Sequence, residues 1–188
     1  MTTRSLGLHI FRRDLRLEDN TSLRFVLEQC TTVIPCFIFN PAQVETNPYR
    51  SDNAIQFMLS SLSELDDELR KHRGQLYFFY GQPEAIVDKL METLPITQVS
   101  VNRDYTPFAR ARDAAIEAAC KKRNVPFHQH ADALLQEPES VHKSDGKPYT
   151  IFTPFKNKAQ TLPVRTPQHT SAKKFYHAQI PFAQDGPA

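Results

Sequence analysis

Side chains that could bind a small ligand follow several short apolar runs of this sequence. Arg12 and Asp14 come directly after one run, and Asp104 and Phe108 come after another. A carboxylate can accept hydrogen bonds from a ring N–H of a heterocycle, and an aromatic side chain can cover the flat face of that ring. Ligands of open α/β sheets bind at the carboxyl ends of the strands. We therefore predict one crevice lined by Arg12, Asp14, Asn40, Asp104 and Phe108.

Each of these groups also has an ordinary structural interpretation. The arginines of the first group could lie in a solvated loop and pair with neighbouring acids. Arg12 could either hold an acidic tail of the ligand or pair with Asp14 to shape the strand end. Asp104 could cap the helix that follows it, with Phe108 packed as a hydrophobic staple. The residue types and their spacing leave these interpretations open.

Other chemistries lack their sequence patterns. The five glycines form neither a G-x-G-x-x-G after a strand nor a P-loop, which argues against an ordinary NAD enzyme or a P-loop ATPase. There is no nucleophile elbow and no Cys-His motif. His128 and His130 alternate on one strand face, but no cysteine or acid stands at a spacing that would complete a metal site. No bound metal is therefore expected.

The elements that would carry the crevice are five strand patterns that alternate with helix patterns. They are predicted at residues 8–11, 32–39, 76–80, 98–102 and 125–130. Units that recur at about 25 to 30 residues predict right-handed crossovers between parallel strands. The fold class is therefore α/β, a doubly wound five-stranded parallel sheet with helices on both faces, similar to a Rossmann fold.

Several residues mark where these elements begin, end or bend. Pro35 within the second strand predicts a bulge or an edge position, and residues 40–50 predict a loop. Gly74 is predicted to end a long helix. Helix starts are predicted at residues that can cap or open a helix, namely Asp19 or Asn20, Ser51 or Asp52, Pro83, and Thr106 with Pro107.

The last quarter of the chain has a different character. Residues 1–135 are predicted to form the α/β domain, and residues 136–188 an interdomain linker or an irregular tail. Prolines interrupt a polar run beyond Asn157, and no apolar period continues there. Single apolar anchors are expected at Phe175, Tyr176 and Phe182.

Composition sets broad limits on the protein. A net charge of +2 over 188 residues is too small to argue for nucleic-acid binding by electrostatics alone. The three cysteines are odd in number and stand among apolar residues, which indicates reduced, buried thiols. The N-terminus lacks a signal-peptide pattern, and no apolar run reaches membrane-spanning length. We predict a soluble, cytoplasmic protein without a membrane partner.

Three motifs in order resemble those of the DNA photolyase and cryptochrome flavoproteins. They are FRRDLRLEDNTSL at residues 11–23, NRDYTPFARARD at residues 102–113 and YTIFTPFKN at residues 149–157. The resemblance covers residues 6–157 and leaves the tail after them unmatched. It implies the N-terminal antenna domain of this family, which holds a light-harvesting chromophore that passes excitation energy to a catalytic FAD.

The resemblance also bears on which chromophore is bound. Family members with a folate antenna carry an Asn-Glu pair before the Arg-Ala-Arg-Asp run, and Phe108 and Ala109 stand at those places here. Members with a deazaflavin or flavin antenna carry an acid that Asp104 matches, although a second acid is replaced by Thr106. The resemblance therefore favours a deazaflavin or a flavin over a folate, or else an empty site.

The resemblance also implies which partners this domain needs. FAD, lesion recognition and a chain of tryptophans belong there to a helical C-terminal domain, and this sequence contains no tryptophan. The resemblance implies part of a deoxyribodipyrimidine photolyase, which repairs UV-induced pyrimidine dimers in DNA with light. The isolated chain is expected to be non-catalytic and to need that helical FAD domain, through which it would meet damaged DNA. Three alternatives stay open: a cryptochrome-type blue-light receptor, a stand-alone nucleotide-type binding module, and a structural remnant or partner domain of a second chain.

Overall fold

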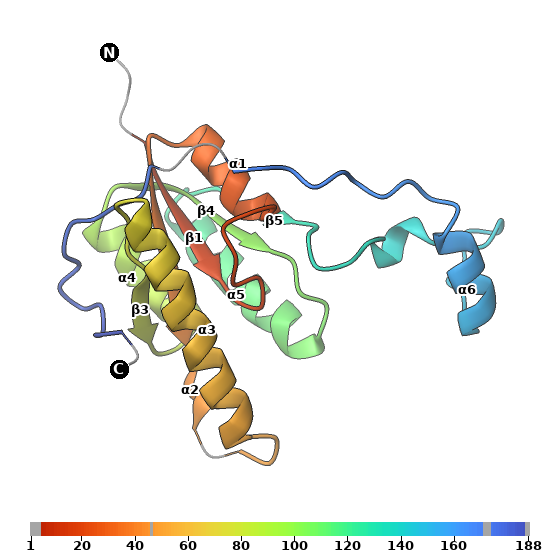
Figure 1. Ribbon diagram of the computed structural model, residues 1–188, viewed down its shortest axis with the longest axis horizontal. Helices are drawn as coiled ribbons and strands as arrows, with labels where there is room; N and C mark the ends of the chain where they lie inside the picture. The colour runs from red at the N-terminus through yellow and green to blue at the C-terminus, as the bar shows by residue number, and fades with distance from the viewer. Residues whose placement is uncertain (1–4, 46, 171–173, 187–188) are drawn as a thin grey trace.

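A single parallel sheet organises the computed structural model, which describes residues 5–45, 47–170 and 174–186. Its strands lie in the order β3-β2-β1-β4-β5 (Figure 1). Their bounds are β1 Leu6–Phe11, β2 Thr32–Phe39, β3 Tyr77–Tyr80, β4 Ile96–Asn102 and β5 Phe127–His130. The predicted five-stranded parallel α/β sheet is confirmed. The winding direction reverses between β1 and β4, and such a switch point is where doubly wound sheets bind ligands.

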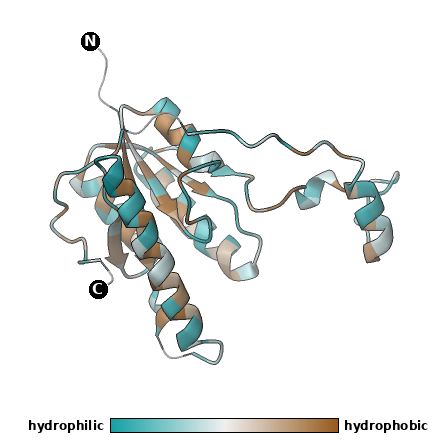
Figure 2. Ribbon diagram, viewed as in Figure 1, coloured by the Kyte–Doolittle hydropathy of each residue, from teal (hydrophilic) through white to brown (hydrophobic). Residues whose placement is uncertain are grey.

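Helices cover both faces of this sheet, and each face has its own apolar core. The helices are α1 Thr21–Gln29, α3 Asp52–Lys71, α4 Pro83–Thr93 and α5 Pro107–Lys122. Side chains of α1 and α3 share one core with Phe11, and those of α4 and α5 share the other with Leu8 and Ile10. Alternate residues of a strand point to opposite faces, so one strand supplies both cores. Figure 2 shows apolar residues gathered on the sheet and along one side of α3.

These helices begin at the predicted residues, and the hydrogen bonds of three predicted caps are present. Asn20 accepts a hydrogen bond from the backbone N–H of Leu23 at 3.0 Å, and Ser51 begins α3 in the same way. Thr106 caps α5 by accepting from Ala109 N–H at 3.1 Å, and Pro83 and Pro107 occupy first-turn positions. These caps satisfy N–H groups that have no partner inside their helices.

The edge position predicted for Pro35 is wrong, because β2 is an inner strand. It pairs with β1 in unbroken register, with His9 opposite Pro35, and on its other side with β3. Val33 turns its N–H and C=O towards residues 174–176, and β3 begins only opposite Cys36. Alternate residues of a parallel strand turn to the same neighbour, so Pro35 faces the place where β2 changes partner. Its missing N–H therefore breaks no ladder there.

Two further local predictions need correction. Residues 40–50 are not wholly irregular, because they contain the short helix α2 (Pro41–Val44), whose single turn is too short to show a period. The residue with left-handed backbone after α3 is Arg73, with φ 59°, and not Gly74. Gly74 is instead required by packing, since a Cβ there would lie 2.6 Å from Cβ of Phe175.

The chain after β5 leaves the body as an arm (residues 131–170) and then returns along the opposite edge of the sheet (Figure 1). The arm contains a 3-10 turn, η1 (Pro138–Ser140), and the helix α6 (Phe152–Ala159), which the expectation of an irregular tail missed. The anchors predicted in the tail are confirmed. Phe175 is buried and bridges Val33, Tyr176 packs on Tyr77, and Phe182 packs on Phe79. The domain division at residue 135 stays a prediction.

The cysteines and the helices bear on two predictions from composition. All three cysteines are buried free thiols, as predicted. Among the helices of the described residues, none has both the length and the apolar character needed to cross a bilayer.

Candidate functional site

A cleft of about 1160 Å³ lies at the carboxyl ends of β1 and β2, bordered by α3 on one side and α5 on the other. Four of the five predicted site residues line this cleft, namely Arg12, Asn40, Asp104 and Phe108. They come from three strand ends and the start of α5, and so are close in space although far apart in sequence. The fifth residue, Asp14, does not line it.

Aromatic side chains stand on both sides of the cleft. Phe108 is 43% exposed on the α5 side, and Tyr49 and Phe57 are largely exposed on the opposite side. Exposed aromatic faces of this size can cover a flat ring, which a packed core residue cannot do. Phe108 is the second residue of α5, which is not one of the two positions that form a hydrophobic staple, so that interpretation is not supported.

Within the described residues, one of the two carboxylate oxygens of Asp104 accepts hydrogen bonds from the backbone. Thr106 caps α5, so the alternative role of Asp104 as the helix cap is wrong. Within the described chain its hydrogen bonds all go to Oδ1, the closest from Tyr105 N–H at 2.7 Å. Oδ2 can therefore accept a hydrogen bond from a ligand in the cleft.

Asn40 combines a place in the cleft with a structural role. Its side chain is buried and its Oδ1 accepts from Ala42 N–H at 3.0 Å, which caps α2. A second contact, from the Tyr80 hydroxyl to the Glu45 carboxylate, ties the end of α2 to β3. Together these bonds hold the segment that closes the cleft over β2.

Arg12 is a buried ion-pair partner and not a solvated side chain. Its Nη2 lies 2.7 Å from Asp113 Oδ1, and its Nη1 donates to Oδ2 of the same carboxylate at 2.9 Å. Arg112 donates through Nε to Asp113 Oδ1 at 3.0 Å. Burial, and next to it the charge of Arg112, lower the pKa of the Arg12 guanidinium. Two arginines therefore share one buried acid at the cleft, a pair that sequence reasoning missed.

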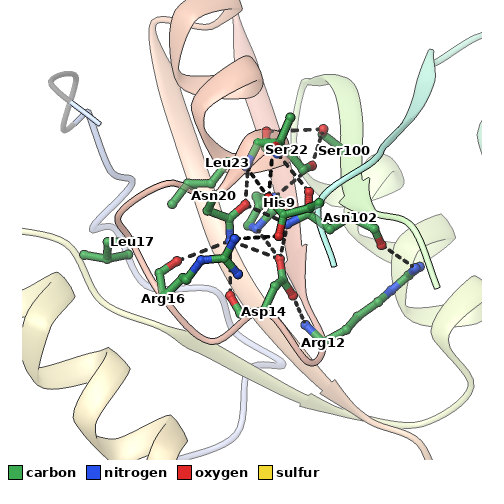
Figure 3. A network of polar contacts seen from close by, with 12 residues as sticks. His9, Arg12, Asp14, Arg16, Leu17, Asn20, Ser22, Leu23, Ser100 and Asn102 are labelled. Carbon is green, nitrogen blue, oxygen red and sulfur yellow. Dashed lines mark hydrogen bonds and ion pairs between the residues drawn. The ribbon is translucent and has the colours of Figure 1, made fainter. Parts of the chain in front are cut away.

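Asp14 lies behind the cleft, in a buried network that joins β1, α1 and β4 (Figure 3). Its Oδ1 accepts from Arg12 N–H at 2.9 Å, and its Oδ2 accepts from the side-chain amides of Asn20 at 3.0 Å and Asn102 at 2.5 Å. The carboxylate thus fixes the turn that follows β1. Asp14 is close to Arg12 in the sequence, but its side chain does not line the cleft.

His9 completes this network and was missed because it stands inside an apolar run. Its ring is fully buried, with Nδ1 3.3 Å from the Ser22 hydroxyl, which in turn lies 2.6 Å from the Ser100 hydroxyl. Nε2 lies 3.8 Å from Asp14 Oδ2. Burial lowers the pKa of His9 to about 4, although the nearby Asp14 charge acts in the opposite direction. His9 is therefore neutral at neutral pH.

Comparison with known proteins places this geometry in a family. The family model described as DNA photolyase matches residues 7–172, and so extends past the last motif recognised in the sequence. A deoxyribodipyrimidine photo-lyase of Alkalihalophilus pseudofirmus is 33% identical over 77% of this chain and 30% of its own length. Cryptochrome-1 of Drosophila melanogaster is 32% identical over 78% of this chain and 28% of its own length.

A solved structure agrees with these sequence matches. The photolyase of Sulfolobus tokodaii, described with two FAD molecules and as implying a novel light-harvesting cofactor, superposes with a TM-score of 0.83 at 40% identity. That match covers 91% of this chain and 38% of the archaeal protein, so the chain spans about a third of the photolyases it resembles. With its fold, its cleft at the strand ends and these matches agreeing, the chain belongs to the DNA photolyase family.

Proposed function

We propose that this chain is the light-harvesting domain of a DNA photolyase and that its cleft binds a flavin-type antenna chromophore. The observation that carries the proposal is the cleft at the strand ends, with Asp104 and the exposed ring of Phe108 on its wall. The S. tokodaii relative, with its second FAD, supports a flavin over other chromophores. The replacement of the folate-type Asn-Glu pair by Phe108 and Ala109 argues in the same direction.

The residues present fit such a group. Asp104 Oδ2 can accept a hydrogen bond from a ring N–H, and Phe108 can cover one face of the ring. Asn40 would close the cleft from the side of β2. Arg112 Nη2 is a buried donor without a hydrogen-bond partner among the described residues, which is a feature of a site that receives an acceptor.

The residues of this chain would bind and orient the chromophore without making or breaking bonds. A chromophore of this kind supplies absorption of near-ultraviolet or blue light when it is bound. In the whole protein, the partner would be a helical domain that carries the catalytic FAD and meets UV-damaged DNA, where pyrimidine dimers are repaired. A cryptochrome-type light receptor is the second candidate, because the D. melanogaster cryptochrome is almost as similar to this chain as the photo-lyase is. We also propose a cytoplasmic location, from the three buried free thiols.

Absorption spectroscopy tests the antenna proposal. The purified chain is incubated with FMN, FAD, a deazaflavin or a reduced folate and then passed through gel filtration. A flavin or deazaflavin band should stay with the protein, and Asp104→Asn should weaken its retention, because the amide no longer offers a carboxylate. Asp67→Asn, an exposed acid on α3 outside the cleft, is the matched control. A folded chain that retains none of these compounds would contradict the proposal for the isolated domain.

A further inference from the structure

The charges around the cleft are strongly unequal. Four arginines line it, Arg12, Arg13, Arg50 and Arg112, and Asp104 is the one acid among the lining residues that the structure describes. The outer two are screened by water, because Arg13 is exposed and Arg50 pairs with the exposed Asp52 at 2.8 Å. The inner two are largely shielded from water. The electrostatic attraction of the cleft for an anion therefore depends mainly on Arg12 and Arg112.

One carboxylate bonds both of these guanidinium groups. The side chains of Arg12 and Arg112 are only 8% and 11% exposed, and the Asp113 carboxylate between them is 4% exposed. In the described structure, no second acid bonds either guanidinium group. Asp14 is the other buried carboxylate beside Arg12, but it accepts from the backbone N–H of Arg12 and not from its guanidinium, so Asp113 alone bonds both side chains.

A buried guanidinium group costs free energy unless its charge and its N–H groups are matched by groups of opposite sign and by hydrogen bonds. Burial and, next to it, the charge of Arg112 lower the pKa of Arg12, although the Asp113 and Asp14 carboxylates act in the opposite direction. Arg112 Nη2 has no hydrogen-bond partner within the described residues, so the cluster also has donor capacity to spare. Both features would be relieved by an anion that enters the cleft.

Resting on the proposed flavin site, we propose that the cleft selects a phosphate-bearing flavin nucleotide, with the Arg12–Asp113–Arg112 cluster supplying the positive charge that recognises its phosphate. A phosphate ester carries between one and two negative charges at neutral pH, and arginine matches its oxygens well. Arg112 follows Phe108 by four residues on α5, so the two lie on the same helix face. One ligand can therefore contact the ring of Phe108 and the guanidinium of Arg112 at the same time.

Two ligands with the same ring test this proposal. FMN and riboflavin differ in the phosphate alone, so the ratio of their dissociation constants reports recognition of that phosphate. By flavin fluorescence titration at about 0.05 M salt, FMN should bind at least about tenfold more tightly, which corresponds to about 1.4 kcal/mol. The ratio should fall towards one at about 0.5 M salt, because salt screens the attraction.

A matched pair of variants locates the effect. Arg112→Gln should weaken FMN binding much more than riboflavin binding and so remove most of the preference for FMN. Arg110→Gln, an exposed arginine of the same helix that does not line the cleft, should leave the preference unchanged. Arg112→Lys keeps the charge but not the fork of donors, and should retain part of the preference.

The outcomes separate this proposal from the function on which it rests. If riboflavin and FMN bind equally well to the unaltered chain, the site is a flavin site but phosphate recognition is refuted. If neither binds while circular dichroism shows a folded protein, both the flavin site and this inference fail. The unaltered chain alone decides between these results, so a variant that does not fold cannot obscure them.

Discussion

Asp14→Asn separates a structural role from a ligand-binding role, because the carboxylate lies in the buried network and not in the cleft. Its oxygens accept three hydrogen bonds, one from Arg12 N–H and two from the amides of Asn20 and Asn102. An asparagine has one acceptor oxygen and one NH2 group. Whichever way it turns, its NH2 group must face at least one of these donors.

The magnitude follows from the better of the two orientations. With its oxygen towards the amides of Asn20 and Asn102, the variant loses the bond from Arg12 N–H and turns the other two from charged to neutral. Hydrogen bonds to charged groups contribute about 1.5–3 kcal/mol and neutral ones about 1 kcal/mol. The lost bond contributes about 1.5–3 kcal/mol and the two converted bonds about 0.5–2 kcal/mol each, so the expected loss of unfolding free energy is about 2.5–7 kcal/mol. That is a large part of the about 5–15 kcal/mol typical of domains.

Urea unfolding followed by far-UV circular dichroism measures this loss, since the sequence contains no tryptophan to report it by fluorescence. Flavin affinity is measured in parallel under conditions where the variant is folded. Stability should fall while the dissociation constant for flavin changes by less than about threefold, because Asp14 does not line the cleft. Asp67→Asn on the exposed side of α3 should stay within about 0.5 kcal/mol. A loss below about 1 kcal/mol, or a selective loss of binding, would refute the structural role.

Three further perturbations address other parts of the molecule. The pKa of His9 is about 4 in the folded protein and 6.5 in the unfolded chain. The contribution of His9 to the unfolding free energy is therefore fully present above pH 6.5 and falls by about 3 kcal/mol as the pH drops to 4. Urea midpoints should show this pH dependence, and His9→Gln should flatten it. Gly74→Ala should lower the unfolding free energy by about 2 kcal/mol in thermal melts, because the new Cβ overlaps the buried ring of Phe175; an unchanged melting temperature would contradict the packing. Asp113→Asn should cost about 3–5 kcal/mol, because two buried guanidinium groups lose the carboxylate that bonds both of them. Arg112→Gln without ligand should cost less than about 1 kcal/mol, because Asp113 keeps Arg12 as its partner. Equal losses in urea unfolding would contradict this assignment.

The arrangement of elements could be predicted because its signals are local. Apolar runs of strand length, helix stripes and the capping residues Asn20, Ser51 and Thr106 all act within a few residues of the chain. Two of the local predictions that failed, those for Pro35 and Gly74, lie where long-range contacts override a local preference. Pro35 is tolerated in an inner strand because β2 changes partner beside it, and Gly74 is needed for the ring of Phe175, about a hundred residues later in the chain.

The candidate site was predicted in part. Residue type and position at strand ends sufficed to place Arg12, Asn40, Asp104 and Phe108 at one cleft. The same reasoning grouped Asp14 with them, because it follows the same strand. Adjacent residues of a turn can point in opposite directions, and a sequence pattern does not show which of them reaches the cleft.

By itself, then, the sequence determined the α/β fold, the order of its strands and helices along the chain, and the family. The tertiary structure alone decided which charges meet. Arg12 and Asp113 are 101 residues apart, and nothing local to either marks the other as its partner. Likewise the partners of His9, Ser22 and Asp14, reach its ring from other elements of the fold, and no local pattern marks them. Charge pairing and burial depend on distances through space, and these exist only after the strands have taken their places in the sheet.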